Sequence, residues 1–198
     1  MKNNTKLCKH CISEPIMNSI VIFEKILEND SLIDTIYQIT KICIQAYQKD
    51  KKLLFCGNGG SAADAQHIAA ELSGKFYIDR RPLNAEALHV NSSFITAVAN
   101  DYGFDKTYSR MIEAIGEKDD VLFGISTSGN SPNVLNALEK AKSLGITTIG
   151  LTGQDGGKMN NFCDFIIQIP SIDTPRIQES HILIGHILCQ LIEQELFS

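Results

Sequence analysis

The chain has 198 residues, 43% hydrophobic and 21% charged, so it is long enough and apolar enough to bury a core. Its 18 Lys and Arg against 23 Asp and Glu give a formal net charge of −5, and no basic run stands out, which disfavours a nucleic-acid-binding protein. No apolar run approaches the ~18 residues of a membrane span. The basic start has no apolar stretch behind it, so we expect a cytoplasmic protein without a membrane anchor or secretory signal.

The first 50 residues are predicted to form two helices that precede any strand. Apolar residues recur every three to four positions on both sides of a break at Asn29-Asp30-Ser31. We therefore divide the chain into an N-terminal helical extension, residues 1–50, and one structural unit, residues 51–198. The extension is expected to pack on that unit or on a partner chain.

Strands and helices alternate from residue 52 onwards. Strands are predicted at 52–56, 85–90, 120–125, 146–151 and 165–169. Helices are predicted at 61–73, 92–99, 104–115, 132–144 and 176–197. This alternation predicts an α/β fold, a doubly wound parallel sheet flanked by helices on both faces.

Six cysteines, without an export signal, are expected to be reduced thiols. Cys8-Lys9-His10-Cys11 has the spacing of metal ligands, but no second cysteine pair completes a four-ligand site, so we do not expect a metal there. Cys43, Cys56, Cys163 and Cys189 lie in apolar surroundings and are predicted to be small core residues.

Two strands are followed by unusually polar turns, Gly57-Asn58-Gly59-Gly60-Ser61 and Ser126-Thr127-Ser128-Gly129-Asn130-Ser131. Ligands of open α/β sheets bind at these strand ends, where backbone amides and hydroxyls at a helix start can hold an anion. Neither turn continues as a P-loop or as G-x-G-x-x-G, which disfavours NTP hydrolysis and dinucleotide binding. One such turn would indicate only a helix cap, but two in one sheet favour a sugar phosphate or a similar anion.

A histidine and a carboxylate follow the first turn on the same predicted helix. His67 and Glu71 are four residues apart, so their side chains lie on one helix face and could share a metal ion. Taken alone, they are more typical of a solvated surface pair, and the case for a metal site gains from the polar turn at the start of the same helix. The last helix carries Gln178, His181 and His186, and the sequence leaves open which of the two histidines joins them.

Several longer motifs resemble those of the bacterial phosphoheptose isomerases, which belong to the sugar isomerase (SIS) superfamily. They cover nearly the whole chain in order, and several are six or more residues long. The matching positions are 56–61, 64–65, 67, 71–74, 99–104, 124–131, 151–153, 155–157, 176–179, 181 and 186.

The resemblance implies a SIS, flavodoxin-like fold assembled as a homotetramer, with one zinc ion per subunit. It implies isomerisation of sedoheptulose 7-phosphate to D-glycero-D-manno-heptose 7-phosphate through an enediol(ate), for heptose and surface polysaccharide (lipopolysaccharide or capsule) biosynthesis. Glu71 and His186 are the implied catalytic residues. The implied zinc ligands are His67, Glu71, Gln178 and His186. The implied substrate contacts are Asn58, Gly59, Gly60, Ser61, Glu71, Lys75, Asn100, Asp101, Ser126, Thr127, Ser128, Ser131 and Gln178.

Two positions depart from the family pattern. Lys75 stands where the family often has arginine, which keeps the charge but loses the bidentate fork. Pro175 stands where a small or acidic residue is frequent, and it removes a backbone N–H.

Helix geometry suggests that the site is shared between subunits. Gln178 and His186 are eight residues apart, a rise of ~12 Å on one straight helix. A single metal would stretch both side chains nearly to their limit, so we predict that His186 comes from a neighbouring chain. The long apolar last helix suits such an interface, although it equally suits the core of its own subunit.

A second function of a different class remains open, a non-catalytic SIS regulator or sugar-phosphate-binding scaffold. Such a protein need not retain the Glu71 and His186 pair, so their joint presence favours the enzyme. Turnover of sedoheptulose 7-phosphate would distinguish the two.

Overall fold

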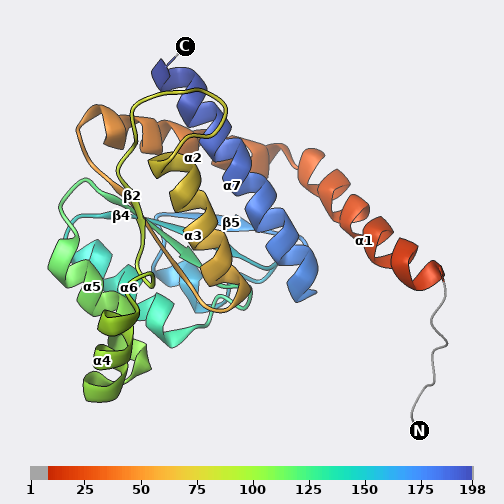
Figure 1. Ribbon diagram of the computed structural model, residues 1–198. Helices are drawn as coiled ribbons and strands as arrows, with labels where there is room; N and C mark the ends of the chain where they lie inside the picture. Colours follow the sequence, from red (N-terminus) through yellow and green to blue (C-terminus); the bar gives the residue numbers. More distant parts are fainter. Residues whose placement is uncertain (1–8, 198) are drawn as a thin grey trace, which may run out of the picture.

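The computed structural model describes residues 9–197, in which a five-stranded parallel sheet is covered by helices on both faces (Figure 1). The strand order is β2-β1-β3-β4-β5, with β1 and β3 adjacent near the middle. The strands are β1 (Leu53–Gly57), β2 (Ala85–Ala87), β3 (Val121–Ile125), β4 (Thr147–Thr152) and β5 (Phe165–Gln168). The helices are α1 (His10–Leu27), α2 (Asp30–Gln48), α3 (Gly60–Ser73), α4 (Ser92–Tyr102), α5 (Thr107–Ile115), α6 (Pro132–Ser143) and α7 (Thr174–Phe197). The predicted fold class is confirmed.

The predicted elements all occur, but several differ in extent from the prediction; the predicted helix 92–99, for example, continues to Tyr102 in α4. The predicted strand 85–90 is reduced to the three residues of β2. The predicted helix 104–115 is divided into the short 3-10 helix η1 (Phe104–Lys106) and α5. Helix α4 ends at Gly103, whose φ of 90° is a conformation that favours glycine, and η1 begins at the next residue. A further 3-10 helix, η2 (Gly157–Asn161), was not predicted.

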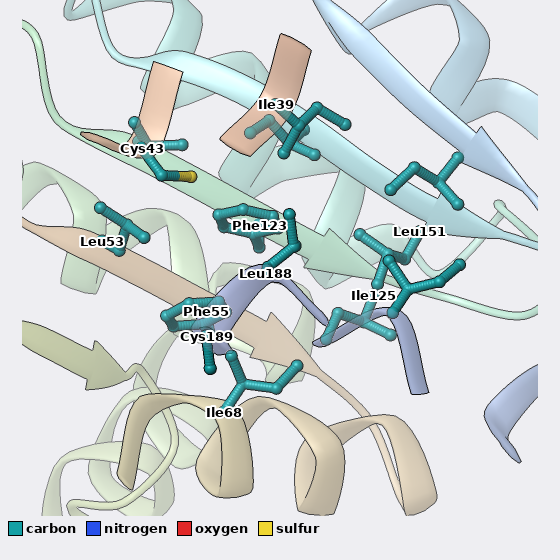
Figure 2. Packing of buried hydrophobic residues seen from close by; sticks show 14 of the residues in the cluster. Ile39, Cys43, Leu53, Phe55, Ile68, Phe123, Ile125, Leu151, Leu188 and Cys189 are labelled. Carbon is teal, nitrogen blue, oxygen red and sulfur yellow. The ribbon is translucent and has the colours of Figure 1, made fainter. Parts of the chain in front are cut away.

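Successive residues of a strand point to opposite faces of the sheet, so each face has its own hydrophobic core. On one face, Phe55 and Phe123 stack with ring centroids 4.9 Å apart, and Leu188 of α7 and Ile68 of α3 lie over them (Figure 2). On the other face, alternate strand residues pack with α5 and α6. Cys43, Cys56 and Cys189 are buried and Cys163 is half-buried, so the predicted place of these four cysteines in the core is confirmed.

Helix α1 extends away from the sheet (Figure 1) and leaves much of its apolar surface exposed, including Ile12, Ile16 and Met17. It is joined to the start of α7 by the Ser19 hydroxyl, which donates to Glu179 at 2.7 Å. The division of the chain at residue 50 stays a prediction. Cys8 lies outside the described residues, so the Cys8–Cys11 motif is not tested. Within residues 9–197, no helix is both long and apolar enough to cross a membrane.

Candidate active site

The two polar turns lie side by side because they follow neighbouring parallel strands. Gly57 of β1 is in register with Ile125 of β3, so both turns leave the same edge of the sheet. A pair of side-chain amides joins them: Asn58 Nδ2 donates to Asn133 Oδ1, and Asn133 Nδ2 donates back to Asn58 Oδ1, both at 2.9 Å. Asn133 is buried in the first turn of α6, so this pair fixes the two turns relative to one another.

Hydroxyl groups gather in the second turn. Ser126 Oγ lies 2.9 Å from Ser131 Oγ and 3.4 Å from Ser128 Oγ, and Ser126 is only 4% exposed. Gly129 has a φ of +63°, and a Cβ there would lie 2.0 Å from the carbonyl oxygen of Gly156, so the turn accepts only glycine at this point. Packing against the Gly156 turn therefore holds three hydroxyls together at the start of α6, an arrangement that suits an anion.

Thr127 faces a different part of the same edge of the sheet. Its carbonyl oxygen accepts a hydrogen bond from Gly153 N. Thr127 and Ser128 line a cavity of about 290 Å³ together with residues that follow β4 and with the first turn of α7. Two of the four predicted phosphate-binding residues thus border a cavity, whereas Ser126 and Ser131 do not line it.

His67, Glu71 and His186 come together where α3 packs beside α7. His67 Nε2 lies 3.1 Å from Glu71 Oε1 and 3.4 Å from His186 Nε2. The helices approach closely because Gly185 has no side chain: a Cβ there would lie 2.6 Å from Ile68 Cδ1. This contact between the residues next to His67 and His186 aligns α3 with α7 and brings the two imidazole rings together edge to face, with centroids 5.0 Å apart.

The three side chains fit the geometry of a metal site. One ligand atom from each lies within 4.8 Å of the other two. Two ligands of a tetrahedral zinc ion, each about 2.0–2.1 Å from the metal, lie roughly 3.3 Å apart, close to the two spacings found here. Two imidazole nitrogens and one carboxylate oxygen are also a donor set that zinc accepts.

The choice between the two histidines of α7 is decided by their surroundings. His181 is fully buried, and its Nε2 lies 3.2 Å from the carbonyl oxygen of Thr152 at the end of β4. Burial lowers the pKa of His181 to about 4, partly opposed by that hydrogen bond. His181 is therefore a neutral core residue, and His186 is the one that faces His67.

Gln178 contacts α3 at a different level from the histidines. Its side-chain amide lies against Gly60, where a Cβ would come within 2.5 Å of Gln178 Nε2. Gly60 and Ser61 form the first turn of α3, so this contact is about two turns before His67. Among the predicted zinc ligands, only Gln178 is absent from the close cluster of the other three.

The prediction that His186 comes from a neighbouring chain is wrong. His186 meets His67 and Glu71 of its own chain. The helical argument required Gln178 and His186 to reach one point from α7 alone, but the side-by-side packing of α3 and α7 lets each contact α3 at its own level. The cluster therefore forms without a second subunit.

Three residues near the site were given no role from the sequence, although position 64 belongs to a matching motif. Asn133 pairs with Asn58, and the Tyr108 hydroxyl donates to Gly57 O and Asn58 Oδ1. Asp64 lies one helical turn before His67; burial raises its pKa to about 6, while His67 lowers it. Asn133 lies just beyond the matched positions 124–131, and nothing in the sequence shows that it contacts Asn58.

The remaining predicted contacts lie at the surface. Asn100 and Asp101 are exposed near the end of α4, where Asn100 Nδ2 donates to Asp101 Oδ1 at 2.8 Å. Gly59 and Lys75 are exposed, just before and just after α3. Pro175 is the second residue of α7, where its missing N–H has no intrahelical partner to lose, so it is compatible with the helix.

Comparisons with known proteins agree with this arrangement. The family model described as the SIS domain matches residues 18–153, which with the parallel sheet and its polar turns defines a SIS-domain protein. Phosphoheptose isomerase from Clostridium acetobutylicum is 54% identical over 189 residues, 96% of this chain and 96% of that protein. Its counterpart from Sulfurimonas denitrificans is 51% identical over 189 residues, 96% of this chain and 97% of that protein.

Solved structures give the same result. The structure of phosphoheptose isomerase from Neisseria gonorrhoeae matches with a TM-score of 0.88 and 40% sequence identity, covering 94% of this chain and 98% of that chain. The chain therefore belongs to the phosphoheptose isomerase family, and the resemblance drawn from its motifs is confirmed.

Proposed function

We propose that the protein is an aldose–ketose isomerase that converts sedoheptulose 7-phosphate to D-glycero-D-manno-heptose 7-phosphate, for heptose and surface polysaccharide biosynthesis. The observation that carries this proposal is the meeting of His67, Glu71 and His186 in a chain at least 50% identical to two phosphoheptose isomerases. The reaction needs groups that move protons at one end of the substrate and an anion site at the other.

Glu71 and His186 are the proposed catalytic residues. The isomerisation moves one proton between adjacent carbons and another between their oxygens. The Glu71 carboxylate takes the carbon-bound proton, which gives the enediol(ate), and the His186 imidazole moves the proton between the oxygens. Their positions beside His67, with oxygen and nitrogen atoms 3.1 and 3.4 Å from His67 Nε2, support a role for both groups at one site.

The two polar turns are the proposed phosphate and sugar sites. Ser126, Thr127, Ser128 and Ser131 bind the phosphate, supported by the hydroxyl cluster at the start of α6. On α3, His67 lies about 9 Å beyond Ser61 at ~1.5 Å per residue. An extended sugar can therefore run from the turns along α3, its reacting carbons beside Glu71 and its phosphate at the hydroxyls. The further contacts proposed for the sugar are Asn58, Gly59, Gly60, Ser61, Lys75 and Gln178.

Zinc is the proposed metal, held by His67, Glu71 and His186, with Gln178 as a predicted fourth ligand. Support comes from the nitrogen and oxygen donor set and from its ligand spacings. When bound, zinc would act as a Lewis acid that polarises the substrate carbonyl. Glu71 and His186 must then each serve both as ligand and as proton-transferring group, which requires the Glu71 carboxylate to shift or use its two oxygens differently and the His186 imidazole to leave the metal or use its other nitrogen.

A homotetramer with sites near its interfaces is the proposed assembly, in the cytoplasm. The exposed apolar face of α1 supports an association between copies. Asn100 and Asp101, exposed near the end of α4, suit a contribution to the sugar site of a neighbouring subunit. No nucleic-acid or membrane partner is proposed.

A turnover assay tests this function. The full chain is mixed with sedoheptulose 7-phosphate and, in parallel, with shorter ketose phosphates, each with added zinc and with a chelator. We expect turnover of the seven-carbon substrate that the chelator removes and zinc restores. No turnover of any ketose phosphate, with or without zinc, would favour the non-catalytic regulator instead.

A further inference from the structure

The segment that follows α3 is fastened to the last turns of α7 by a single buried carboxylate. Glu193 is 1% exposed, and its two oxygens accept hydrogen bonds from three consecutive backbone N–H groups, those of Phe76 (3.2 Å), Tyr77 (2.6 Å) and Ile78 (2.9 Å). Figure 1 shows this segment looping over the C-terminal end of α7. Three successive donors on one carboxylate fix the path of the chain here.

Arg80 connects the same carboxylate to α3. Its Nε donates to Glu193 Oε1 at 2.9 Å, and the side chain is 2% exposed. The other guanidinium nitrogens donate to carbonyl oxygens at the end of α3: those of Leu72 (2.9 Å) and Glu71 (3.1 Å). The planar fork of arginine thus caps the carbonyl groups that a helix end leaves without partners, including that of Glu71 itself.

Burial raises the pKa of Glu193, but the backbone N–H groups and Arg80 outweigh it, so the pKa is below its ordinary value and the group stays a carboxylate. This carboxylate forms a buried ion pair with the Arg80 guanidinium, with Nε and Oε1 2.9 Å apart.

The segment 76–78, which Glu193 holds, contacts His186 through the Phe76 side chain. The Phe76 ring is stacked beside the His186 imidazole, with centroids 5.7 Å apart and planes 29° apart. His186 and Glu193 are seven residues apart on α7, which puts them on the same side of the helix. One network therefore contacts Glu71 through its carbonyl oxygen and His186 through Phe76.

We propose that Glu193 and Arg80 are positioning residues of the isomerase: they fix the end of α3 and the segment 76–78 against α7, and so set the placement of Glu71 relative to His186. The proposal rests on the proposed function for its kinetic part, but the structural placement of His186 is measured independently of turnover. Neither side chain touches the substrate in this scheme.

The chain contains a matched control for this network. Asp120 is also fully buried, accepts from two backbone N–H groups, Lys52 N (3.1 Å) and Glu117 N (2.8 Å), and pairs with Lys52 Nζ at 2.8 Å. It lies just before β3, at the edge of the sheet opposite the polar turns. Removing its charge causes the same kind of damage as removing that of Glu193, but far from Glu71 and His186.

The experiment compares Glu193→Gln with Asp120→Asn in the full chain. The amide introduced at position 193 turns one acceptor into a donor that faces backbone N–H groups or Arg80, so the segment 76–78 shifts. A misplacement of about 1 Å can cost ~10²-fold in rate, so we expect kcat to fall about tenfold to hundredfold, by more than KM changes. Asp120→Asn should lose comparable stability and keep kcat near the wild-type value.

Histidine NMR supplies the readout that does not depend on turnover. The chain has five histidines, and His186→Gln assigns the His186 imidazole signal in protein labelled at histidine. Because the Phe76 ring shields that imidazole, Glu193→Gln and Phe76→Leu should both shift its signal, whereas Asp120→Asn should leave it in place. If Glu193→Gln does not fold, Arg80→Lys replaces it, since lysine keeps the charge but cannot reach the same set of carbonyl oxygens.

Each result decides the proposal. A shifted His186 signal with reduced kcat in the Glu193 or Arg80 variant, and neither in the Asp120 variant, supports it. An unmoved signal, or a kcat no lower than that of Asp120→Asn, overturns it. Absence of turnover in the wild-type protein overturns the proposed function instead, and the NMR comparison still decides whether the network positions His186.

Discussion

The two ends of the proposed substrate site are built in different ways. At the hydroxyl end, the turn 126–131 is locked by backbone packing, with Gly129 pressed against Gly156 and Ser126 almost buried. At the cluster end, His67, Glu71 and His186 are partly exposed, and their placement depends on how α3 and α7 pack. The comparison teaches that a fixed anion site can be built from local turn chemistry, whereas a proton-transferring site needs groups from elements far apart in the sequence.

The contrast has a physical reason. Hydroxyl and backbone N–H groups bind a phosphate without changing their own protonation, so a rigid turn serves well. Groups that transfer protons must change protonation and reach the substrate, so they stand where solvent and substrate reach them. Damage at the two ends should therefore appear in different kinetic constants.

The largest effect is expected at the cluster end. Glu71→Gln keeps size and hydrogen bonding but removes the basic oxygen, so kcat should fall by ~10²–10⁴-fold, the usual contribution of general acid–base catalysis, while the fold survives. Steady-state turnover of sedoheptulose 7-phosphate and thermal melting measure this. Glu113→Gln, which removes an exposed carboxylate on α5 paired with Lys140, is the control and should change neither. Near-normal turnover of Glu71→Gln would show that Glu71 is not the base.

A smaller effect is expected at the hydroxyl end, and it should appear in substrate affinity rather than in kcat. Ser126→Ala and Ser128→Ala each remove a hydroxyl that would donate to the phosphate. A lost hydrogen bond to a charged group costs roughly 1.5–3 kcal/mol, about a tenfold to hundredfold loss of substrate affinity. Substrate binding is measured by calorimetry in the Glu71→Gln background, with Ser143→Ala at the exposed end of α6 as the control. If both variants bind as tightly as the parent, the phosphate lies elsewhere.

A third effect, in the free energy of unfolding rather than in a kinetic constant, concerns the buried His181. His181 of α7 contacts the carbonyl oxygen of Thr152 at the end of β4, and burial lowers its pKa from 6.5 to about 4. Between pH ~6.5 and ~4, His181 is therefore protonated in the unfolded chain but neutral in the folded chain. The resulting stability is complete above pH ~6.5 and is lost as the pH falls towards ~4, by up to about 1.4 kcal/mol per pH unit.

Urea unfolding from pH 8 to pH 4 measures this dependence on wild type and on His181→Gln, which can still donate to Thr152 but does not titrate. We expect the slope of unfolding free energy against pH to be lower in the variant across that window. Equal slopes would mean that His181 takes up its proton at the same pH in the folded and the unfolded chain. The side chain would then not be isolated from solvent, and the prediction would be wrong.

Much of the architecture followed from local sequence patterns. Spacing of apolar residues predicted the helices and strands in order, but it missed a boundary inside the predicted helix 104–115, whose first three residues form η1 before α5 begins at Thr107. The spacing of His67 and Glu71 fixed their common helix face, because neighbours four residues apart are set by the helix itself. Likewise, the residues of the turn 126–131 lie together because they are consecutive in the chain.

The sequence by itself therefore determined the order of elements, the family motifs and the two polar turns, all of which depend on residues close together along the chain. The family motifs already implied His186, but only the tertiary structure showed why His186 rather than His181 joins His67, that Gln178 contacts Gly60, and that Glu193 meets Arg80. These contacts join residues more than 100 positions apart, and they depend on the alignment of α3 with α7, which is set where Gly185 admits Ile68. A shift of one residue between the two helices would turn different side chains towards each other, and no local pattern records that alignment.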